Sequence, residues 1–486
     1  MSLPFPVLAQ TESGAIAAFE VVIMVVVFGI LFGWVGNAMS TKADKAWLPR
    51  LVVWAFMAKL AGAFARYYMV NTLYNSGDSF RYHGAGQIFA NVWRGGSIPV
   101  STAGGEGTAF TEVVTGFLYA IYTPTFLGGF VMFAILAFVG QLLFYAAFRP
   151  WAQEERLKPY GNVVLLLPSL VFWPASIGKD ALMVLFLGVA TYGASRMLRN
   201  YQFSALLLIA PGLYLASEIR PHVAALLGLS LVLALLFGKP PRKFEKHPKR
   251  AVMVLFSVVG AALALAAFAA TFDVSVEGGG GTQDPGAFLE DVEEQTARGG
   301  SQIGGAAVTS PAQLPGAIIT VLYRPLLHEG TSGQVILSAL EGTALLVFTI
   351  WKLPVMWRNK GLLREKPYLL MCFFYTGGFI IAFSAILNLG ILARQRVQML
   401  PMFLALLVAL SWEKSKSKTE RDRAKLERRA PRRPRSEDPV DASIPAIEPP
   451  AGETRDERGV RPPRSRSRQA PTDSAKGQAS GRRPRR

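Results

Sequence analysis

The residues best suited to chemistry are charged side chains at the ends of long apolar runs. The segment Gly77-Asp78-Ser79-Phe80-Arg81-Tyr82-His83 directly follows one such run. A carboxylate held there, Asp78, could act as general base on a hydroxyl that arrives from the aqueous phase. The competing explanation is that Asp78 caps a helix beginning at Ser79, which needs only a short polar side chain.

A second group, Lys179 and Asp180, ends the segment Trp-Pro-Ala-Ser-Ile-Gly-Lys-Asp at a later turn. The Lys179 ammonium could bind a lipid phosphate, while Asp180 could cap the helix that follows. A Lys–Asp pair that reaches from a membrane end into the headgroup region is the alternative. The segment is not a P-loop, because the glycine spacing and the following Ser or Thr of that motif are missing.

Glu218, Arg220 and His222 fall together in the segment Glu-Ile-Arg-Pro-His at another turn. Ionisable groups at membrane depth are costly unless they are paired or wet, so a functional role is the first interpretation. A salt-bridged structural turn is the alternative.

Arg394 and Arg396 flank a glutamine at the last turn. Two guanidinium groups suit bidentate capture of phosphate or pyrophosphate. Arg324 and His328 stand just before a predicted span and are assigned to the same substrate-binding group. Glu341 falls about two turns into that span, where we expect it to pair with an inward-facing Arg or Lys.

The elements that must position these residues are membrane helices. Apolar runs recur from residue 14 to residue 412, and many can cross about 30 Å of hydrocarbon as helices of about 20 residues. Six basic clusters lie between them, at 42–50, 149–158, 196–199, 239–250, 352–366 and from 414 onward. Basic loops stay in the cytoplasm. The pattern therefore predicts an all-α polytopic integral membrane protein, with its N-terminus outside and its C-terminus in the cytoplasm. The residues named above then fall in external turns.

Alternating the sidedness predicts about eleven transmembrane helices. The predicted spans are 15–39, 49–71, 125–148, 161–176, 180–197, 202–217, 221–238, 250–272, 334–357, 367–388 and 395–412. The first run is predicted to be a retained helix rather than a signal peptide, because no Lys or Arg precedes it. The short apolar segment 111–124 is predicted to be an interfacial or re-entrant helix.

The predicted organisation is a membrane domain, 1–412, followed by a disordered basic cytoplasmic tail, 413–486. Two long external loops interrupt the domain, at 71–124 and 273–333. The end of the second loop, 314–328, is apolar, and we expect it to lie against the membrane surface.

Composition excludes several classes of protein. Hydrophobic residues make up 51% of the chain and the mean hydropathy is +0.31, which indicates a membrane protein. The single cysteine, Cys372, excludes a disulfide framework and a cysteine-based metal site. The net charge of +18 belongs mainly to the tail and the cytoplasmic loops, so it does not indicate nucleic-acid binding.

The motif Gly-Asp-x-x-x-Tyr-His in the first long external loop resembles the opening motif of the multi-spanning GT-C glycosyltransferases. The resemblance implies that Asp78 is the catalytic base and that Tyr82 and His83 are its neighbours. It also implies a polyprenyl-phosphate lipid as the sugar donor. Here the motif follows the second predicted span, whereas the family has it after the first, so an extra N-terminal helix is implied. The family's second acid is replaced at best by Glu106 or Glu112.

The leading hypothesis is a glycosyltransferase of the cell envelope, in the bacterial plasma membrane. It would transfer a sugar from a polyprenyl-phosphate donor to a polysaccharide or glycolipid acceptor on the extracytoplasmic face. Two alternatives stay open. One is a polysaccharide polymerase or ligase of the O-antigen type, whose external arginines would hold lipid pyrophosphate. The other is a transporter or flippase of a lipid-linked intermediate, although the charges gather at one face and no repeat is evident.

No metal site is predicted. The external histidines His83, His222 and His328 lack metal-ligand spacing. Asp78 with Glu106 or Glu112 could hold a divalent cation, but no spacing demands one. The sequence identifies neither the sugar nor the acceptor.

Overall fold

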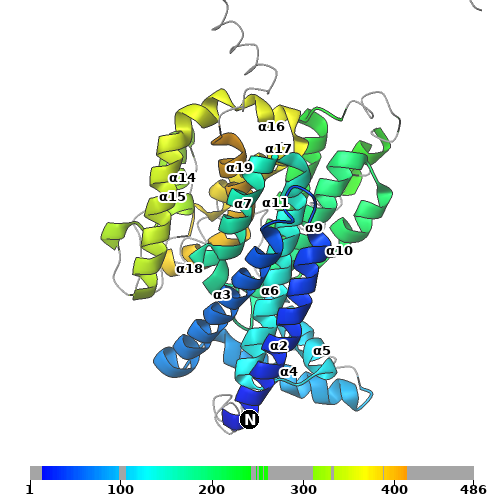
Figure 1. The fold of residues 1–486 in the computed structure, drawn as a ribbon, viewed down its shortest axis with the longest axis vertical. Helices are drawn as coiled ribbons and strands as arrows, with labels where there is room; N and C mark the ends of the chain where they lie inside the picture. Colours follow the sequence, from blue (N-terminus) through cyan, green and yellow to red (C-terminus); the bar gives the residue numbers. More distant parts are fainter. Residues whose placement is uncertain are drawn as a thin grey trace, which may run out of the picture. The chain divides into compact units, whose positions relative to one another are not determined.

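The computed structural model describes residues 14–97, 106–241, 248, 251–255, 257–260, 310–329, 333–386 and 388–412. Every regular element in these residues is helical (Figure 1), which confirms the predicted all-α class. Contacts divide the chain into one compact unit, Met1–Ser415, and a second, Lys416–Arg486. The predicted tail 413–486 and most of the predicted loop 273–333 lie outside the described residues.

In chain order the elements are α2 (Gly14–Met39), α3 (Leu48–Tyr68), η1 (Met69–Tyr74), α4 (Asp78–Arg94), α5 (Glu106–Ile121), α6 (Phe126–Phe148), η2 (Arg149–Trp151), α7 (Glu154–Leu166), α8 (Pro168–Phe172), α9 (Lys179–Asn200), η3 (Phe203–Ala205), α10 (Leu206–Ser217), α11 (Pro221–Phe237), η5 (Pro311–Gln313), α14 (Leu314–Tyr323), η6 (Leu327–Glu329), α15 (Gly333–Arg358), α16 (Gly361–Glu365), α17 (Pro367–Phe383), α18 (Leu389–Gln395), η7 (Arg396–Gln398) and α19 (Leu400–Leu410).

Five of the described helices are long and apolar enough to cross a membrane. They are Gly14–Met39, Leu48–Tyr74, Phe126–Trp151, Lys179–Asn200 and Val335–Arg358. A sixth span results if the bent pair Leu389–Gln398 and Leu400–Leu410 is taken as one. Further predicted spans correspond to apolar helices of 10–17 residues, which are shorter than the roughly 20 residues that cross a bilayer without help. The membrane-protein class is thus supported, while the predicted number of eleven spans stays a prediction.

Helices α6 and α9 form the centre of the bundle and lie side by side (Figure 1). Their backbones touch, because Gly140 and Gly188 face each other. A Cβ on Gly188 would come within 2.6 Å of the Gly140 carbonyl oxygen. Small residues allow such close packing between membrane helices, where dispersion replaces the hydrophobic effect as the driving force. The contact holds α9 against α6.

The predicted span 161–176 is not one helix. The structure ends α7 at Leu166, starts the five-residue α8 at Pro168, and leaves the chain in turns up to Gly178. Proline explains the break, because it cannot donate a backbone hydrogen bond and its ring disfavours helix in the residue before it.

Buried side chains satisfy the backbone groups freed around α8. The fully buried Lys59 donates from Nζ to the Leu170 carbonyl at 2.8 Å. The carboxylate of Glu341, on α15, accepts from the Ser169 N–H at 2.7 Å. Non-helical backbone is tolerated at membrane depth only where protein buries it in this way.

The predicted external loop 71–124 is largely helical. It contains η1, α4 and α5, and the last two pack side by side as a hairpin (Figure 1). Gly86 on α4 makes this packing possible, since a Cβ there would meet the Thr115 side chain at 2.6 Å. The predicted interfacial segment 111–124 contains α5 from Thr111 to its end at Ile121 and the three residues that follow.

The predicted surface segment 314–328 contains α14, which packs against α15 and α17. Ala317, Val321, Leu322 and Tyr323 are buried there. This apolar face is therefore covered by other helices of the protein.

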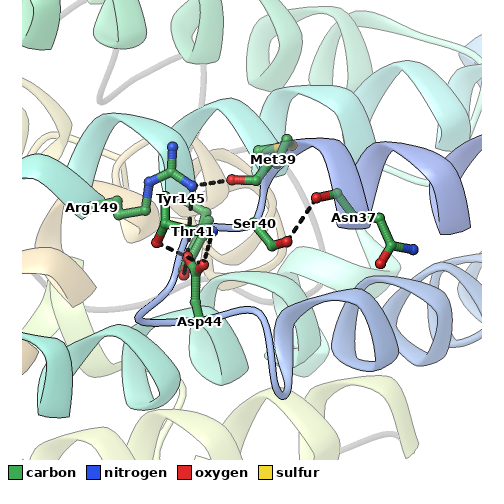
Figure 2. A network of polar contacts seen from close by, with 7 residues as sticks. All are labelled: Asn37, Met39, Ser40, Thr41, Asp44, Tyr145 and Arg149. Atoms are coloured by element: carbon green, nitrogen blue, oxygen red, sulfur yellow. Dashed lines mark hydrogen bonds and ion pairs between the residues drawn. The ribbon is translucent and has the colours of Figure 1, made fainter.

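Predicted cytoplasmic segments meet at one end of the bundle. Asp44, fully buried between α2 and α3, accepts hydrogen bonds from the Tyr145 hydroxyl at 2.8 Å and the Thr41 hydroxyl at 2.9 Å (Figure 2). Arg149 lies 3.6 Å from the same carboxylate and also donates to the Met39 carbonyl. This network ties the α2–α3 turn to the end of α6.

The same end joins later basic segments. Lys366 donates to the Trp151 carbonyl. Arg156 donates to the Ala409 carbonyl at 2.6 Å, and Asn359 donates to the Trp412 carbonyl at 2.8 Å. Three of the six basic clusters, at 42–50, 149–158 and 352–366, and the last described residues before the tail thus share one end. The side of the membrane on which that end lies stays a prediction.

Candidate functional site

The site centres on a carboxylate at the start of α9. Gly178 precedes this helix with φ of +151°, a conformation that suits glycine. Asp180 is 2% exposed. Its Oδ1 accepts from Arg220 Nη2 at 3.2 Å, and its Oδ2 forms an ion pair with Nε of Arg394. One carboxylate thus joins the start of α9, the residue before α11 and the end of α18.

Arg66, near the end of α3, adds a third guanidinium. Its Cζ lies 5.1 Å from the Phe172 ring centroid and 5.2 Å from that of Trp173, both cation–π contacts. It interacts electrostatically with Asp180 and Arg394. Its Nε is buried and has no hydrogen-bond partner. The aromatic rings hold this cation in place without neutralising it.

Asp78 is the first residue of α4 and is exposed. The Ser79 hydroxyl donates to the Ile177 carbonyl at 2.9 Å, so the start of α4 is fixed beside the start of α9. Asp78 interacts electrostatically with Lys179 and Arg394. Its carboxylate makes neither a hydrogen bond nor an ion pair with any residue that the structure describes. The exposed carboxylate thus lies where a hydroxyl group from the aqueous phase can reach it.

Tyr82 lies between these groups. It is 1% exposed, and a Cβ on Gly178 would lie 3.4 Å from its ring. Burial, together with the negative charge of Asp78, raises the pKa of Tyr82 to about 12. The hydroxyl therefore stays neutral at physiological pH, and it shares a hydrogen bond with Thr108 of α5.

We call this group the charge cluster, and it consists of Arg66, Asp78, Lys179, Asp180, Arg220 and Arg394. Four cations against two carboxylates leave a formal charge of +2. Besides Arg66 Nε, the buried Nη1 of Arg220 has no hydrogen-bond partner. The half-buried Lys179 makes no hydrogen bond or ion pair with a described residue. The arrangement can bind an anion next to an unpaired carboxylate.

Three predicted site residues lie beside the cluster rather than in it. His83 is 2% exposed and hydrogen-bonds the Tyr119 hydroxyl at 3.0 Å, which ties α4 to α5. Glu218 hydrogen-bonds Tyr214, one turn earlier on α10. His222 packs on the Phe383 ring, with 5.6 Å between centroids.

The structure places the predicted residues Arg324, His328 and Arg396 elsewhere. Arg324 pairs with Glu329 at 2.6 Å, and His328 is exposed on η6. Arg396 is fully buried, and its Nη1 donates to the carbonyls of Leu322 at 3.0 Å and Arg324 at 2.9 Å. These contacts hold α14 and the residues after it against η7, so Arg396 does not belong to the charge cluster.

The partner predicted for Glu341 is confirmed in part. Its charge interacts with that of Arg396, an inward-facing arginine, but its hydrogen bond goes to the Ser169 N–H. Glu341 Oε1 has no hydrogen-bond partner.

A pocket of about 150 Å³ adjoins Arg66, since the two aromatic rings under that guanidinium form part of its wall. Its lining is Met69, Pro168, Ser169, Phe172, Trp173, Leu337, Ser338 and Glu341. Most of these side chains are apolar, so the pocket suits a hydrocarbon group beside the cluster.

Sequence reasoning missed Arg66 and Tyr375. Arg66 stands at the predicted outer end of the second predicted span. The positive-inside rule does not favour a cation there, and that signal could have been used. The Tyr375 hydroxyl is buried on α17 without a hydrogen-bond partner, and its electrostatic neighbour is Arg220. No local sequence signal distinguishes this tyrosine from others in the spans.

The structure offers little to a metal ion. Glu112, considered with Asp78 as a cation ligand, is paired with Arg81 at 2.6 Å. The Glu106 side chain lies outside what the structure describes. Within the described ranges, no three His, Cys, Asp or Glu side chains converge.

Comparison of the chain with models of protein families, with curated proteins and with solved structures finds no match.

Proposed function

We propose that the chain is a membrane glycosyltransferase. It transfers a sugar from a polyprenyl-phosphate-linked donor to an envelope polysaccharide or glycolipid acceptor on the extracytoplasmic face. The observation that supports this most is the convergence of Asp78, Lys179, Asp180, Arg220 and Arg394. These residues come from four separate segments. The exposed Asp78 carboxylate interacts with two cations, Lys179 and Arg394, and Asp180 joins Arg220 to the same group.

The chemistry follows from the types of side chain. The acceptor hydroxyl attacks the anomeric carbon of the donor sugar and gives its proton to the Asp78 carboxylate. The bond between that carbon and the phosphate oxygen breaks, and the bonding electrons stay on the phosphate. Arg220 and Arg394 then face an anion whose charge grows during the reaction, so they stabilise the transition state more than the ground state.

Asp180 contributes by positioning. Because it neutralises one cation and holds two guanidiniums on its two oxygens, both are in place before the donor binds. Such pre-organised charges need no rearrangement during the reaction, which is why they are effective.

Asp78→Asn tests the proposal. General-base catalysis contributes about 10²–10⁴-fold, so transfer by the purified variant should fall by at least about 10²-fold. Expression and membrane insertion should be unchanged, since the Asp78 side chain is exposed and makes no hydrogen bond or ion pair with a described residue.

The matched control is Glu365→Gln, which removes an exposed carboxylate from α16, near the end of the bundle that carries Lys366. It should leave transfer unchanged. Transfer by Asp78→Asn at the wild-type rate would remove Asp78 as base and the proposal with it.

A polysaccharide polymerase or ligase is the second candidate, because the same cluster could hold the phosphate linkage of a lipid-linked oligosaccharide. The donor discriminates the two: a single lipid-linked sugar for the first and a lipid-linked oligosaccharide for the second.

A further inference from the structure

We infer that the charge cluster is built for a diphosphate, the linkage of a polyprenyl-diphosphate saccharide, rather than for a single phosphodiester. This inference rests on the proposed function and specifies the linkage of its lipid donor, which becomes a diphosphate in place of a single phosphate. Three features support it: the number of hydrogen-bond donors without a partner, the placement of these donors, and the net positive charge of the cluster.

The free donors outnumber the oxygens of one phosphodiester. Arg66 Nε and Arg220 Nη1 are buried without partners, and the Lys179 ammonium has none among the described residues. Arg394 uses Nε for Asp180, and its side chain is 33% exposed, so its terminal nitrogens can reach a ligand. These groups belong to four segments. A phosphodiester has two non-bridging oxygens, whereas a diphosphate diester has four, enough for each cation to meet one.

The placement of the donors separates them into two sets. Arg220 and Arg394 are fixed next to each other, because the two oxygens of Asp180 hold one each. Arg66 makes no bond to Asp180 and rests on the Phe172 and Trp173 rings. Two phosphoryl groups joined by a bridging oxygen can address both sets.

The charge agrees with this count. The cluster has a formal charge of +2, and a diphosphate diester carries two negative charges where a phosphodiester carries one. A buried charge without a counter-charge is costly. The diphosphate therefore neutralises the cluster, while a phosphodiester would leave one cation unmatched.

The diphosphate that binds is part of a lipid and is not free pyrophosphate. The rings under Arg66 also line the mostly apolar pocket of about 150 Å³. A hydrocarbon chain attached to the phosphate nearest Arg66 would begin there. Free pyrophosphate has no group for this pocket.

Binding to the purified full chain in detergent tests the inference. The probes are P1-farnesyl P2-methyl diphosphate, farnesyl methyl phosphate and inorganic pyrophosphate, titrated in a calorimeter at fixed ionic strength. The diphosphate lipid should bind at least about 10-fold more tightly than the monophosphate lipid, because it gains charge-assisted hydrogen bonds to the second phosphoryl group. It should also bind more tightly than pyrophosphate, because the pocket holds its chain.

The variant Arg66→Lys tests whether the Arg66 guanidinium causes the preference for the diphosphate lipid. The substitution keeps the cation and removes the Nε–H donor that has no partner. It should weaken binding of the diphosphate lipid by about 10-fold and binding of the monophosphate lipid by less than about 3-fold. Binding of the monophosphate lipid shows that the variant is folded. The control Arg196→Ala removes a cation near the opposite end of α9 and should change neither affinity.

Equal affinity of wild type for the two lipids would overturn the diphosphate assignment and leave the proposed transferase standing. Tighter binding of inorganic pyrophosphate than of the diphosphate lipid would overturn the assignment of the diphosphate to a lipid. Loss of transfer in Asp78→Asn is measured separately, so failure of the proposed function is distinguished from failure of this inference.

Discussion

Replacing Asp180 by asparagine should destabilise the protein strongly. Asparagine keeps the shape of the side chain but removes the charge that holds Arg220 at 3.2 Å and Arg394 on its other oxygen. At an effective dielectric constant of about 20, one pair at this distance is worth roughly 5 kcal/mol before the cost of desolvation. Measured losses for breaking a buried pair are about 3–5 kcal/mol. Because the Arg394 side chain is 33% exposed, we expect the free energy of unfolding to fall by about 3 kcal/mol, at the lower end of that range.

The assay is the free energy of unfolding in mixed detergent micelles, followed by tryptophan fluorescence. The control is Glu154→Gln, an exposed carboxylate in the first turn of α7, which should change stability by no more than about 0.5 kcal/mol. The double variant Asp180→Asn with Arg220→Gln should lose less than the sum of the single losses, since the unpaired buried cation is gone. A loss below about 1 kcal/mol for Asp180→Asn would refute the reasoning, because the pair would then behave like an exposed one.

Three further predictions concern parts of the structure that position the site. Gly62→Ala should destabilise by about 1–3 kcal/mol in the same assay, because its Cβ would lie 2.6 Å from the Val171 carbonyl oxygen; an unchanged value would contradict the close packing of α3 on α8. Asp44→Asn should cost about 1–3 kcal/mol, since the buried Tyr145 hydroxyl loses a charged acceptor, and stability equal to wild type would show that the network is dispensable. Burial favours a raised pKa for Glu329, but hydrogen bonds from its arginine partner and a backbone N–H outweigh this and lower the pKa below its usual 4.5. Its contribution is therefore present above about pH 4.5 and is lost as the pH falls further. The stability difference between wild type and Glu329→Gln should shrink as the pH falls from about 7 to about 3.5. A constant difference would show that the ionised Glu329 and its arginine partner do not stabilise the protein.

The long helices could be predicted because their signal is local. The expected spans 15–39, 125–148 and 180–197 correspond closely to α2, α6 and α9. The break after Leu166 was not predicted, although Pro168 signals it. Whether a proline kinks or ends a membrane helix depends on side chains from elsewhere, here Lys59 and Glu341, that satisfy the freed backbone groups.

In the candidate site, too, the residues with a local sequence signal could be predicted and their contacts with distant residues could not. Asp180, Arg220 and Arg394 could be named from the sequence because charged residues stood out at the ends of apolar runs. Their pairing could not, since it depends on how the starts of α9 and α11 and the end of α18 meet. Arg396 illustrates the limit: it lies two residues from Arg394 and has the same chemistry, yet it turns inward to backbone carbonyls. Position along the chain does not decide which guanidinium faces a ligand.

The proposed function requires the charge cluster to be one outward-facing site that binds a lipid-linked donor. Site-directed labelling with a membrane-impermeant maleimide in intact cells measures this directly, in a Cys372→Ala background that carries either Ser76→Cys or Lys360→Cys. Ser76 is exposed two residues before Asp78, and Lys360 belongs to a basic cluster at the other end. We predict that position 76 is labelled from outside and protected by added polyprenyl-diphosphate saccharide, while position 360 is labelled only after permeabilisation. Labelling of position 360 but not of position 76 in intact cells would contradict the account.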